Sequence, residues 1–354
     1  MRLSLRGDNP TERLALIGGL VPAAAAEAWA GMALSGVLVA AVRTGLTARL
    51  AGRPATAGEL AADLGLDPQP TRMLLDCLQS AGHVSCRAGR YQLSRSSRRW
   101  LDPAAALSVG QFVDAAGDYA AWWSGLEDVT RGAAPAGHHD APPGDPYWRR
   151  YITGQLELAR LSAPEVARKL RLPGDPRSLL DIGGGHGWYS AELCRGYPRL
   201  TATVLDLPGS AAIGREIIAG AGLADRVLYR DGDATTADLG GGYDCVLCFN
   251  LVHHVSQDQA ASLLARIHDA LAPGGSVAVM DVFAEPAGRN SAAANFFGLF
   301  VYLSSGSQVY TPAQLHGWFR DAGFAPPRKI PVRRLPGQAV YVARKAGLAG
   351  AAGR

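Results

Sequence analysis

The stretch from Leu180 to Tyr189 combines an acidic residue with four closely spaced glycines. An apolar run at 178–180 leads into Asp181, glycines follow at positions 183, 184, 185 and 187, and helix-compatible residues come next. This order is typical of a strand, a tight turn and a helix, the opening unit of a doubly wound α/β domain. Glycine suits such a turn because it adopts unusual dihedrals and lets a ligand lie directly on the backbone. No Lys-Ser or Lys-Thr pair follows, as it would in a P-loop.

Two further acidic residues stand where the next strands should end. The β-rich run 201–205 ends at Asp206, which Leu207 and Pro208 follow, and Asp233 follows Gly232 after a third apolar run. A carboxylate at the end of the second strand can accept hydrogen bonds from both hydroxyls of a ribose, a feature that NAD enzymes share. Each aspartate alone could simply cap a helix or a turn. Three in register with three successive strands favour a cofactor site.

The fourth strand leads into two histidines. The run 243–252 is mostly apolar, as a buried parallel strand should be, and His253 and His254 follow it directly. Ligands of open α/β sheets bind beyond the carboxyl ends of the strands, so both side chains are expected near the site. Histidine titrates near neutrality and can take a proton from a phenol or an alcohol. The C-x-x-C of Cys245 and Cys248 lies inside this strand, where core packing is the expected role.

These motifs together resemble the small-molecule O-methyltransferases, which use S-adenosylmethionine and carry an N-terminal winged-helix dimerisation domain. The family includes plant caffeate-type enzymes and bacterial enzymes that methylate polyketides, anthracyclines and related aromatic natural products. Its Asp-x-Gly-Gly-Gly-x-Gly motif is matched at 181–187, its Asp-Leu-Pro at 206–208 and its Gly-Asp at 232–233. Its catalytic histidine falls on His253, and its Leu-x-Pro-Gly-Gly is matched at 271–275. The similarity extends over nearly the whole chain.

The resemblance implies a fold, a reaction and a set of site residues. The fold is a Rossmann-like class I S-adenosylmethionine methyltransferase domain preceded by a mostly helical winged-helix domain. His253 would act as the base that deprotonates a hydroxyl, Asp281 would hold its imidazole, and S-adenosylhomocysteine would be the product, with no metal required. The implied cofactor contacts are Asp181, Gly183, Gly185, Asp206, Leu207, Asp233, Ala234 and Phe249. The implied pocket for an aromatic acceptor includes His254, Asn295, Phe296, Phe300 and Trp148.

The chain departs from the plant members of this family at three positions. Asp281 supplies a shorter carboxylate at the end of the fifth strand than the glutamate of those enzymes. Val309 stands where they carry a second glutamate, and Phe249 stands where they carry a cofactor-contacting lysine. The support of the histidine by two carboxylates is therefore incomplete in this chain.

Length and composition predict two domains in a reducing compartment. The 354 residues suit two domains better than one, and nearly half of them are apolar. The expected division is a helical winged-helix dimerisation domain over 1–130, a linker with connecting helices over 131–165, a catalytic domain over 166–346 and a disordered tail over 347–354. The five cysteines form no disulfide framework and no secretory signal is evident, so a cytoplasmic location is expected. The apolar run 28–42 is expected to be too short to span a membrane.

The N-terminal part reads as helix, turn, helix and hairpin, with a capped helix beginning after Thr56 and a hairpin turn at Ala88-Gly89. Alone, this winged helix would suggest DNA binding. Ahead of a methyltransferase domain it predicts a homodimer, and a net charge of +4 does not resemble that of a nucleic-acid binder. His139, in the Pro- and Gly-rich segment 131–146, is expected to be exposed to solvent.

Two alternatives stay open. Within the fold, the chain could methylate carbon or nitrogen, or be a homologue recruited to hydroxylation, decarboxylation or cyclisation. From another class, it could be a winged-helix DNA-binding regulator.

Overall fold

The computed structural model describes residues 9–172, 174–284, 292–335 and 337–347, and divides into two compact units, Met1–Ala121 and Trp122–Arg354. The tail expected to be disordered falls, except for Gly347, outside the described residues.

The first unit contains six helices, most of a seventh and one β-hairpin within its described residues. They are, in chain order, α1 (Pro10–Ile17), α2 (Ala23–Arg43), α3 (Leu46–Gly52), α4 (Ala57–Leu64), α5 (Pro68–Ser80), β1 (Val84–Arg87), β2 (Arg90–Leu93), α6 (Arg95–Leu101) and α7 (Gly110–Ser124). Thr56 and Glu59 form a capping box at the start of α4, and Gly65 ends that helix in the left-handed conformation. Ala88 and Gly89 both have positive φ, as a tight hairpin turn requires. The predicted helix, helix and hairpin order is therefore present.

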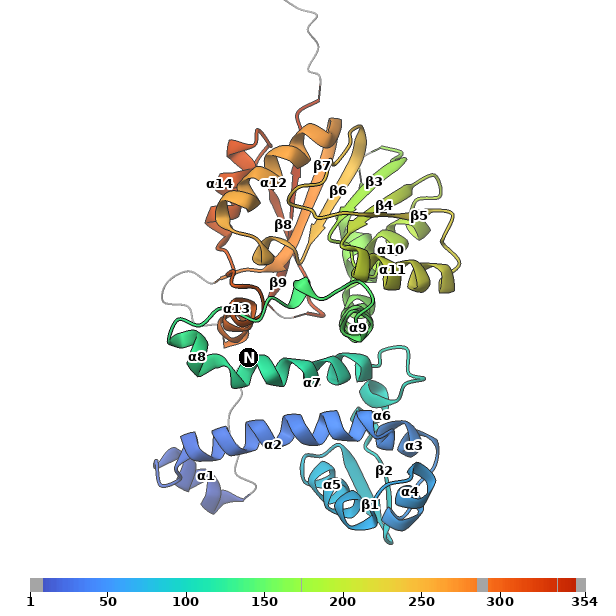
Figure 1. The fold of residues 1–354 in the computed structure, drawn as a ribbon, viewed down its shortest axis with the longest axis vertical. Helices are drawn as coiled ribbons and strands as arrows, with labels where there is room; N and C mark the ends of the chain where they lie inside the picture. The colour runs from blue at the N-terminus through green and yellow to red at the C-terminus, as the bar shows by residue number, and fades with distance from the viewer. Residues whose placement is uncertain (1–8, 173, 285–291, 336, 348–354) are drawn as a thin grey trace, which may run out of the picture. The chain divides into compact units, whose positions relative to one another are not determined.

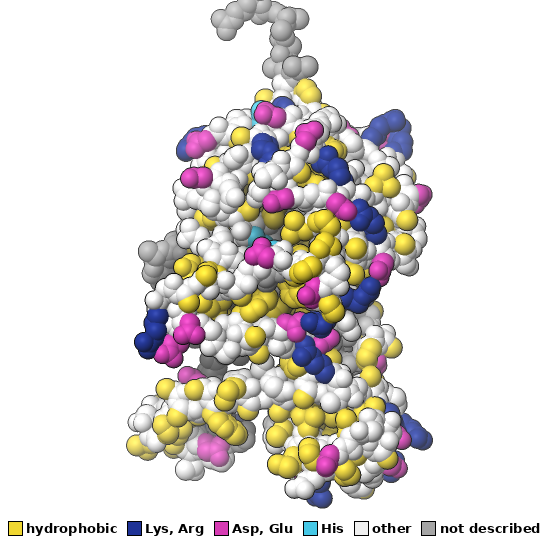
Figure 2. Space-filling view, in the orientation of Figure 1, with side chains coloured by type: hydrophobic (Ala, Val, Ile, Leu, Met, Phe, Trp, Pro, Cys, Tyr) yellow, Lys and Arg dark blue, Asp and Glu magenta, His cyan; other side chains and the backbone are white. Residues whose placement is uncertain are grey.

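Helix α2 is more exposed than a core helix should be. Its 21 residues include a single buried one, Ala41. Trp29 and Met32 are 70% and 74% exposed, and apolar side chains of α1 and its following loop are also exposed. Hydrophobic side chains accordingly gather around α1 and the start of α2 (Figure 2). By length and composition α2 could cross a membrane, which corrects the expectation that this run is too short, because the helix begins at Ala23. A single such helix near the N-terminus is weak support for a membrane span.

The second unit is built on a seven-stranded sheet in the order β5-β4-β3-β6-β7-β9-β8 (Figure 1). Its strands are β3 (Ser178–Ile182), β4 (Thr201–Asp206), β5 (Val227–Asp231), β6 (Tyr243–Phe249), β7 (Leu271–Val282), β8 (Arg328–Pro331) and β9 (Gln338–Arg344). Strands β3 to β7 run parallel, while β9 is antiparallel to both β7 and β8. The strand order reverses between β4 and β6 on either side of β3, which is where open α/β sheets bind ligands.

Helices of the second unit cover both faces of this sheet or lie beyond its strand ends (Figure 1). They are α8 (Leu126–Thr130), η1 (His138–Asp140), α9 (Pro146–Leu170), α10 (Trp188–Gly196), α11 (Pro208–Gly220), η2 (Val252–His254), α12 (Gln257–Ala270), α13 (Ala292–Ser305) and α14 (Pro312–Asp321). One buried cluster joins the sheet to α12 and α14, and a second joins it to α9 and α10. Cys248 belongs to the first cluster and Cys245 to the second, so both cysteines are core residues.

Candidate active site

The glycine turn between β3 and α10 has the geometry that its sequence predicts. Gly183, Gly185 and Gly187 all have positive φ, which L side chains rarely adopt. Gly184 does not, but a Cβ built on it would lie 2.5 Å from Cγ of Asp181. The turn therefore packs directly over the Asp181 carboxyl group and leaves its backbone open to the space above the strand ends.

Asp181 supports this turn from below. Its Oδ2 accepts a hydrogen bond of 2.6 Å from Oγ of Ser190, which lies in the first turn of α10. The side chain is buried, and burial raises its pKa to about 7, against the opposing effect of the Ser190 hydrogen bond. Asp181 thereby fixes the start of α10 relative to the strand that leads into the turn.

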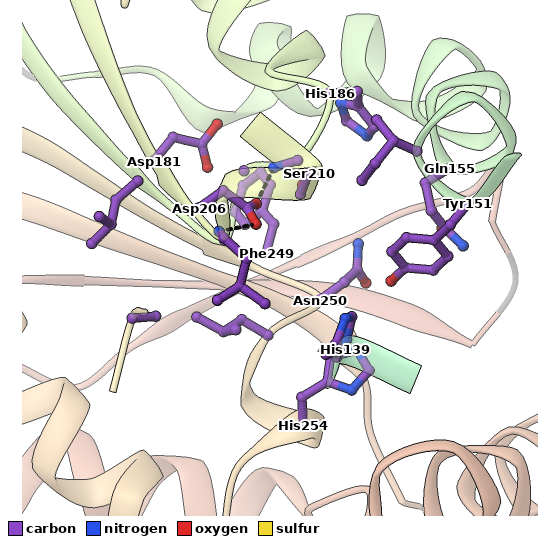
Figure 3. A pocket seen from close by; sticks show the side chains of 18 of the residues that line it. His139, Tyr151, Gln155, Asp181, His186, Asp206, Ser210, Phe249, Asn250 and His254 are labelled. Atoms are coloured by element: carbon purple, nitrogen blue, oxygen red, sulfur yellow. Dashed lines mark hydrogen bonds between the residues drawn. The ribbon is translucent and has the colours of Figure 1, made fainter. Parts of the chain in front are cut away.

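Asp206 is held at the end of β4 by two backbone donors. The amide of Gly185 donates to Oδ2 at 2.6 Å, and the amide of Leu207 donates to Oδ1 at 2.7 Å (Figure 3). Burial raises the pKa of Asp206 to about 6, while these two hydrogen bonds oppose the shift. Each carboxylate oxygen has a second lone pair, so the pair of oxygens can still accept from two neighbouring hydroxyls.

A cavity of about 390 Å³ lies over these strand ends. This volume is within the range of small-molecule sites. All eight cofactor contacts implied by the sequence line it, as do two of the five acceptor-pocket residues: Asp181, Gly183, Gly185, Asp206, Leu207, Asp233, Ala234, Phe249, His254 and Trp148. The cavity therefore offers an open glycine backbone, the two carboxylate oxygens of Asp206 for a ribose, and the acidic residue Asp233 after β5. This set fits a cofactor composed of an adenosine and an amino-acid end.

His253 and Asp281 form a buried pair beside this cavity. Nδ1 of His253 lies 2.6 Å from Oδ1 of Asp281, and the two side chains are 5% and 1% exposed. The backbone amides of Val282 and His253 also donate to this carboxylate, at 2.7 and 3.4 Å. With Nδ1–H of His253 donating to Oδ1 of Asp281, the lone pair of the neutral imidazole lies on Nε2. His253 itself does not line the cavity, and the ring of Phe297 lies 5.1 Å from its imidazole.

His254 does line the cavity, and a histidine far away in the sequence meets it there. The rings of His254 and His139 lie 4.5 Å apart, edge to face, and those of His253 and His254 lie 4.1 Å apart. His139 comes from η1 and also lines the cavity (Figure 3). The expectation that His139 is exposed to solvent is therefore wrong, because η1 folds back over the strand ends. Composition alone predicts a mobile loop and contains no signal for this return.

Three of the aromatic-pocket predictions are placed elsewhere by the structure. Asn295 and Phe296 lie on exposed positions of α13, and Phe296 is 59% exposed. Phe300 packs against Trp122, with ring centroids 5.6 Å apart, and does not line the cavity. Trp148, which does line the cavity, is held in place because its Nε1 donates to the carbonyl oxygens of Ala141 and Pro142.

Several polar cavity residues were not among the sequence predictions, including Tyr151, Gln155, His186, Asn250 and Gln338. Asn250 follows β6 directly, so the strand-end rule that selected the histidines could also have selected it. Tyr151 and Gln155 are four residues apart on α9, which places them on one helix face. His186 occupies a variable position of the glycine motif; burial lowers its pKa to about 3 and keeps it neutral. Gln338 has no local sequence signal.

Comparison with known proteins agrees with this geometry. Residues 142–325 match the O-methyltransferase domain family, and residues 26–103 match the O-methyltransferase dimerisation domain family. The chain is 30% identical to 3-hydroxy-5-methyl-1-naphthoate 3-O-methyltransferase of Streptomyces sahachiroi, over 83% of this chain and 86% of that protein. It is also 30% identical to the tetracenomycin polyketide synthesis 8-O-methyl transferase of Streptomyces glaucescens, over 84% and 90% of the two chains.

Solved structures show the same fold. Human N-acetylserotonin methyltransferase, in complex with S-adenosylmethionine, superposes with a TM-score of 0.81 at 20% identity and covers 96% of this chain and 100% of that one. The sheet and the likeness to this structure define the class I methyltransferase fold, and the family match with the two Streptomyces relatives defines an S-adenosylmethionine-dependent methyltransferase. More narrowly, this chain belongs to the O-methyltransferase family that carries an N-terminal dimerisation domain. The dimerisation-domain match supports a homodimer.

Proposed function

We propose that this protein methylates a phenolic hydroxyl of an aromatic natural product, with His253 as the general base. The observation that carries the proposal is the His253–Asp281 pair, whose 2.6 Å contact orients the imidazole of the residue next to His254, which lines the cofactor cavity. The activities of the two Streptomyces relatives, on a naphthoate and in tetracenomycin synthesis, support an aromatic acceptor. The cytoplasm is the proposed compartment.

The residues divide the work between holding the cofactor and activating the acceptor. Asp206 would accept hydrogen bonds from the ribose hydroxyls, Asp233 and Ala234 would flank the adenine, and the glycine turn would carry the amino-acid end. When bound, S-adenosylmethionine supplies a methyl group on a positively charged sulfur, and transfer to oxygen leaves S-adenosylhomocysteine. Nε2 of His253 would take the hydroxyl proton as the oxygen forms its new bond to carbon, and Asp281 would stabilise the resulting imidazolium.

An acceptor must reach Nε2 of His253 for this mechanism to operate. Phe297 of α13 lies edge to face with the imidazole at 5.1 Å, so an aromatic acceptor would share the space around Nε2 with this side chain. The position that holds a second glutamate in plant relatives is Val309, which a Cβ on Gly298 of α13 would approach to 3.1 Å. The base is thus supported by one carboxylate, and proximity of the two reactants contributes the rest of the acceleration.

The proposal is tested by incubating the protein with S-adenosylmethionine and a panel of naphthols, hydroxynaphthoates and hydroxyanthraquinones, with mass spectrometry of the products. A methyl ether with at least one of these phenols is expected. Methyl transfer only to carbon or nitrogen acceptors, or hydroxylation of the acceptor, would overturn it in favour of the alternatives within the fold.

A further inference from the structure

The cavity contains a pair of side-chain amides that the proposed mechanism does not use. Nε2 of Gln338 donates a hydrogen bond of 3.2 Å to Oδ1 of Asn250, and both residues line the cavity. The inference below rests on the proposed function and assigns a role to Gln338 within it.

Asn250 is locked in an uncommon backbone conformation. Its φ is +53°, in the left-handed region, where asparagine is more readily accommodated than most residues other than glycine. The backbone amide of Asn250 donates to the backbone carbonyl of Met280 on the neighbouring strand at 2.7 Å. Such strained positions persist where the surrounding structure fixes them, and they cluster at functional sites. Asn250 therefore gives Gln338 a rigid partner.

The bonded pair leaves one polar atom of Gln338 buried. Its Oε1 is inaccessible to solvent and has no hydrogen-bond partner among the residues that the structure describes. A buried carbonyl without a donor costs about 1–3 kcal/mol, so buried acceptors in cavities are normally satisfied by a ligand or a water. Oε1 is therefore an acceptor without a donor on a residue that lines the cavity.

The order of the strands places Gln338 on the side of the cavity away from Asp206 and Asp233, the residues expected to hold the ribose and the adenine of the cofactor. Asp206 and Asp233 follow β4 and β5, on one side of β3. Asn250 follows β6, and Gln338 begins β9 opposite Val282 of β7, on the other side of β3. His253 and Asp281 belong to the same two strand ends, β6 and β7. In Figure 3, Asn250 and the His139–His254 pair likewise lie apart from Asp181 and Asp206.

We propose that Gln338 determines acceptor specificity by accepting a hydrogen bond from a second hydroxyl group, close to the hydroxyl that is methylated. In this proposal Asn250 holds the amide by its Nε2, which leaves Oε1 to bind the second hydroxyl, while His253 serves the reacting oxygen. The preferred acceptor is then an aromatic compound with two nearby hydroxyls. Removal of the second hydroxyl leaves Oε1 unpaired on the enzyme, which lowers the preference for the analogue that lacks it.

The test compares 2,3-dihydroxynaphthalene with 2-naphthol, which lacks only the second hydroxyl. Four proteins are used: wild type, Gln338→Met, Gln338→Glu and the control Gln79→Met, which makes the same substitution on the exposed face of α5. Three quantities are measured for each protein. They are kcat/KM for the two naphthols, the affinity of the S-adenosylhomocysteine-loaded protein for the two naphthols, and the affinity of the free protein for S-adenosylhomocysteine.

Wild type and Gln79→Met should prefer the diol by about threefold to tenfold, the range that one neutral hydrogen bond gives. Gln338→Met should lose the preference, Gln338→Glu should keep it because a carboxylate oxygen still accepts, and none should change cofactor affinity. Equal preference in wild type and Gln338→Met overturns the proposal, as does binding of neither naphthol. A loss of cofactor affinity in Gln338→Met also overturns it, since Oε1 would then face the amino group of the cofactor. If no ether forms but the diol still binds preferentially, the proposed reaction fails while the role of Gln338 stands.

Discussion

Oδ1 of Asp281 lies 2.6 Å from Nδ1 of His253, although the two residues are 28 positions apart, with Asp281 in β7 and His253 in η2 after β6. Strands β6 and β7 are paired in parallel through Phe249 and Met280, so their carboxyl ends bring the loop histidine and the strand-end carboxylate together. His254, one residue further on, lines the cavity and contacts Ser305 through Nδ1 at 3.3 Å. Adjacent histidines are thus held by different partners and can be separated by substitution.

The first prediction concerns these two histidines. His253→Ala should lower turnover at least ~100-fold, because a positioned general base contributes about 10²–10⁴ in rate. His254→Ala should change KM more than kcat, since its ring forms part of the cavity wall. Steady-state kinetics on an accepted phenol, with calorimetry of S-adenosylhomocysteine binding to show that both variants keep the cofactor site, separates the roles. The reverse pattern, with only His254→Ala inactive, would falsify the assignment of the base.

Asp206 provides the second prediction, on cofactor affinity. Asp206→Ala should weaken binding of S-adenosylhomocysteine by about 2–3 kcal/mol, roughly 30- to 150-fold, because charge-assisted hydrogen bonds to the ribose are lost. Asp231→Ala is a matched control, because this aspartate ends the neighbouring strand β5 and pairs with Arg215 at 2.5 Å outside the cavity. Titration calorimetry measures both. Equal affinities in wild type and Asp206→Ala would remove Asp206 from the cofactor site.

The raised pKa of Asp206 leads to a third prediction, on pH. Burial raises this pKa to about 6, so the ligand-free fold favours the protonated acid. The corresponding contribution to stability is complete below about pH 4, the pKa of an unfolded aspartate, and is lost as pH rises through 6. Cofactor affinity should move the opposite way, because the ionised carboxylate is the better acceptor for ribose hydroxyls. We expect affinity for S-adenosylhomocysteine to fall between pH 7 and pH 5, and to vary much less in Asp206→Asn. A flat wild-type profile over this interval would contradict this.

The sequence predicts the cofactor half of the site better than the acceptor half. Asp181, Asp206 and Asp233 follow from a local rule, strand followed by acidic residue, and the sheet brings all three to one edge. The acceptor half depends on segments that are distant in the sequence and that the fold brings to the strand ends. His139 arrives through η1 and Gln338 through an antiparallel strand, and neither return is encoded in a local pattern. Asn295 and Phe296 show the converse, because aromatic density along α13 does not determine which helix face meets the cavity.

The exposed face of α2 gives a fourth prediction, on assembly. Trp29 and Met32 are three residues apart on one helix face, and both are exposed. Contiguous exposed apolar surface of this kind marks an interface, and the dimerisation-domain match includes both residues. The double variant Trp29→Glu/Met32→Glu should therefore shift the protein toward a monomer. Gln69→Glu/Gln79→Glu, which adds the same charge to exposed positions of α5, should stay dimeric. Light scattering at micromolar concentration checks both, and an unchanged dimer in the first variant would place the interface elsewhere.

The last prediction concerns a contact that supports the glycine turn from α11. A Cβ on Gly214 would lie 2.3 Å from the carbonyl oxygen of Gly185 and 2.4 Å from the Tyr229 hydroxyl, which itself donates to that carbonyl at 3.0 Å. Gly214→Ala must therefore push the turn and α11 apart, at a cost of about 1–3 kcal/mol in the free energy of unfolding. It should also weaken cofactor binding, because Gly185 donates to Asp206 from the same turn. Gly220→Ala, at the end of the same helix, meets nothing within 4 Å and should be neutral or slightly stabilising. Denaturant unfolding and calorimetry of the two variants test this pair. Equal stability of both would mean that the turn can yield to a methyl group, and that its tight packing on α11 does not hold the cofactor site in shape.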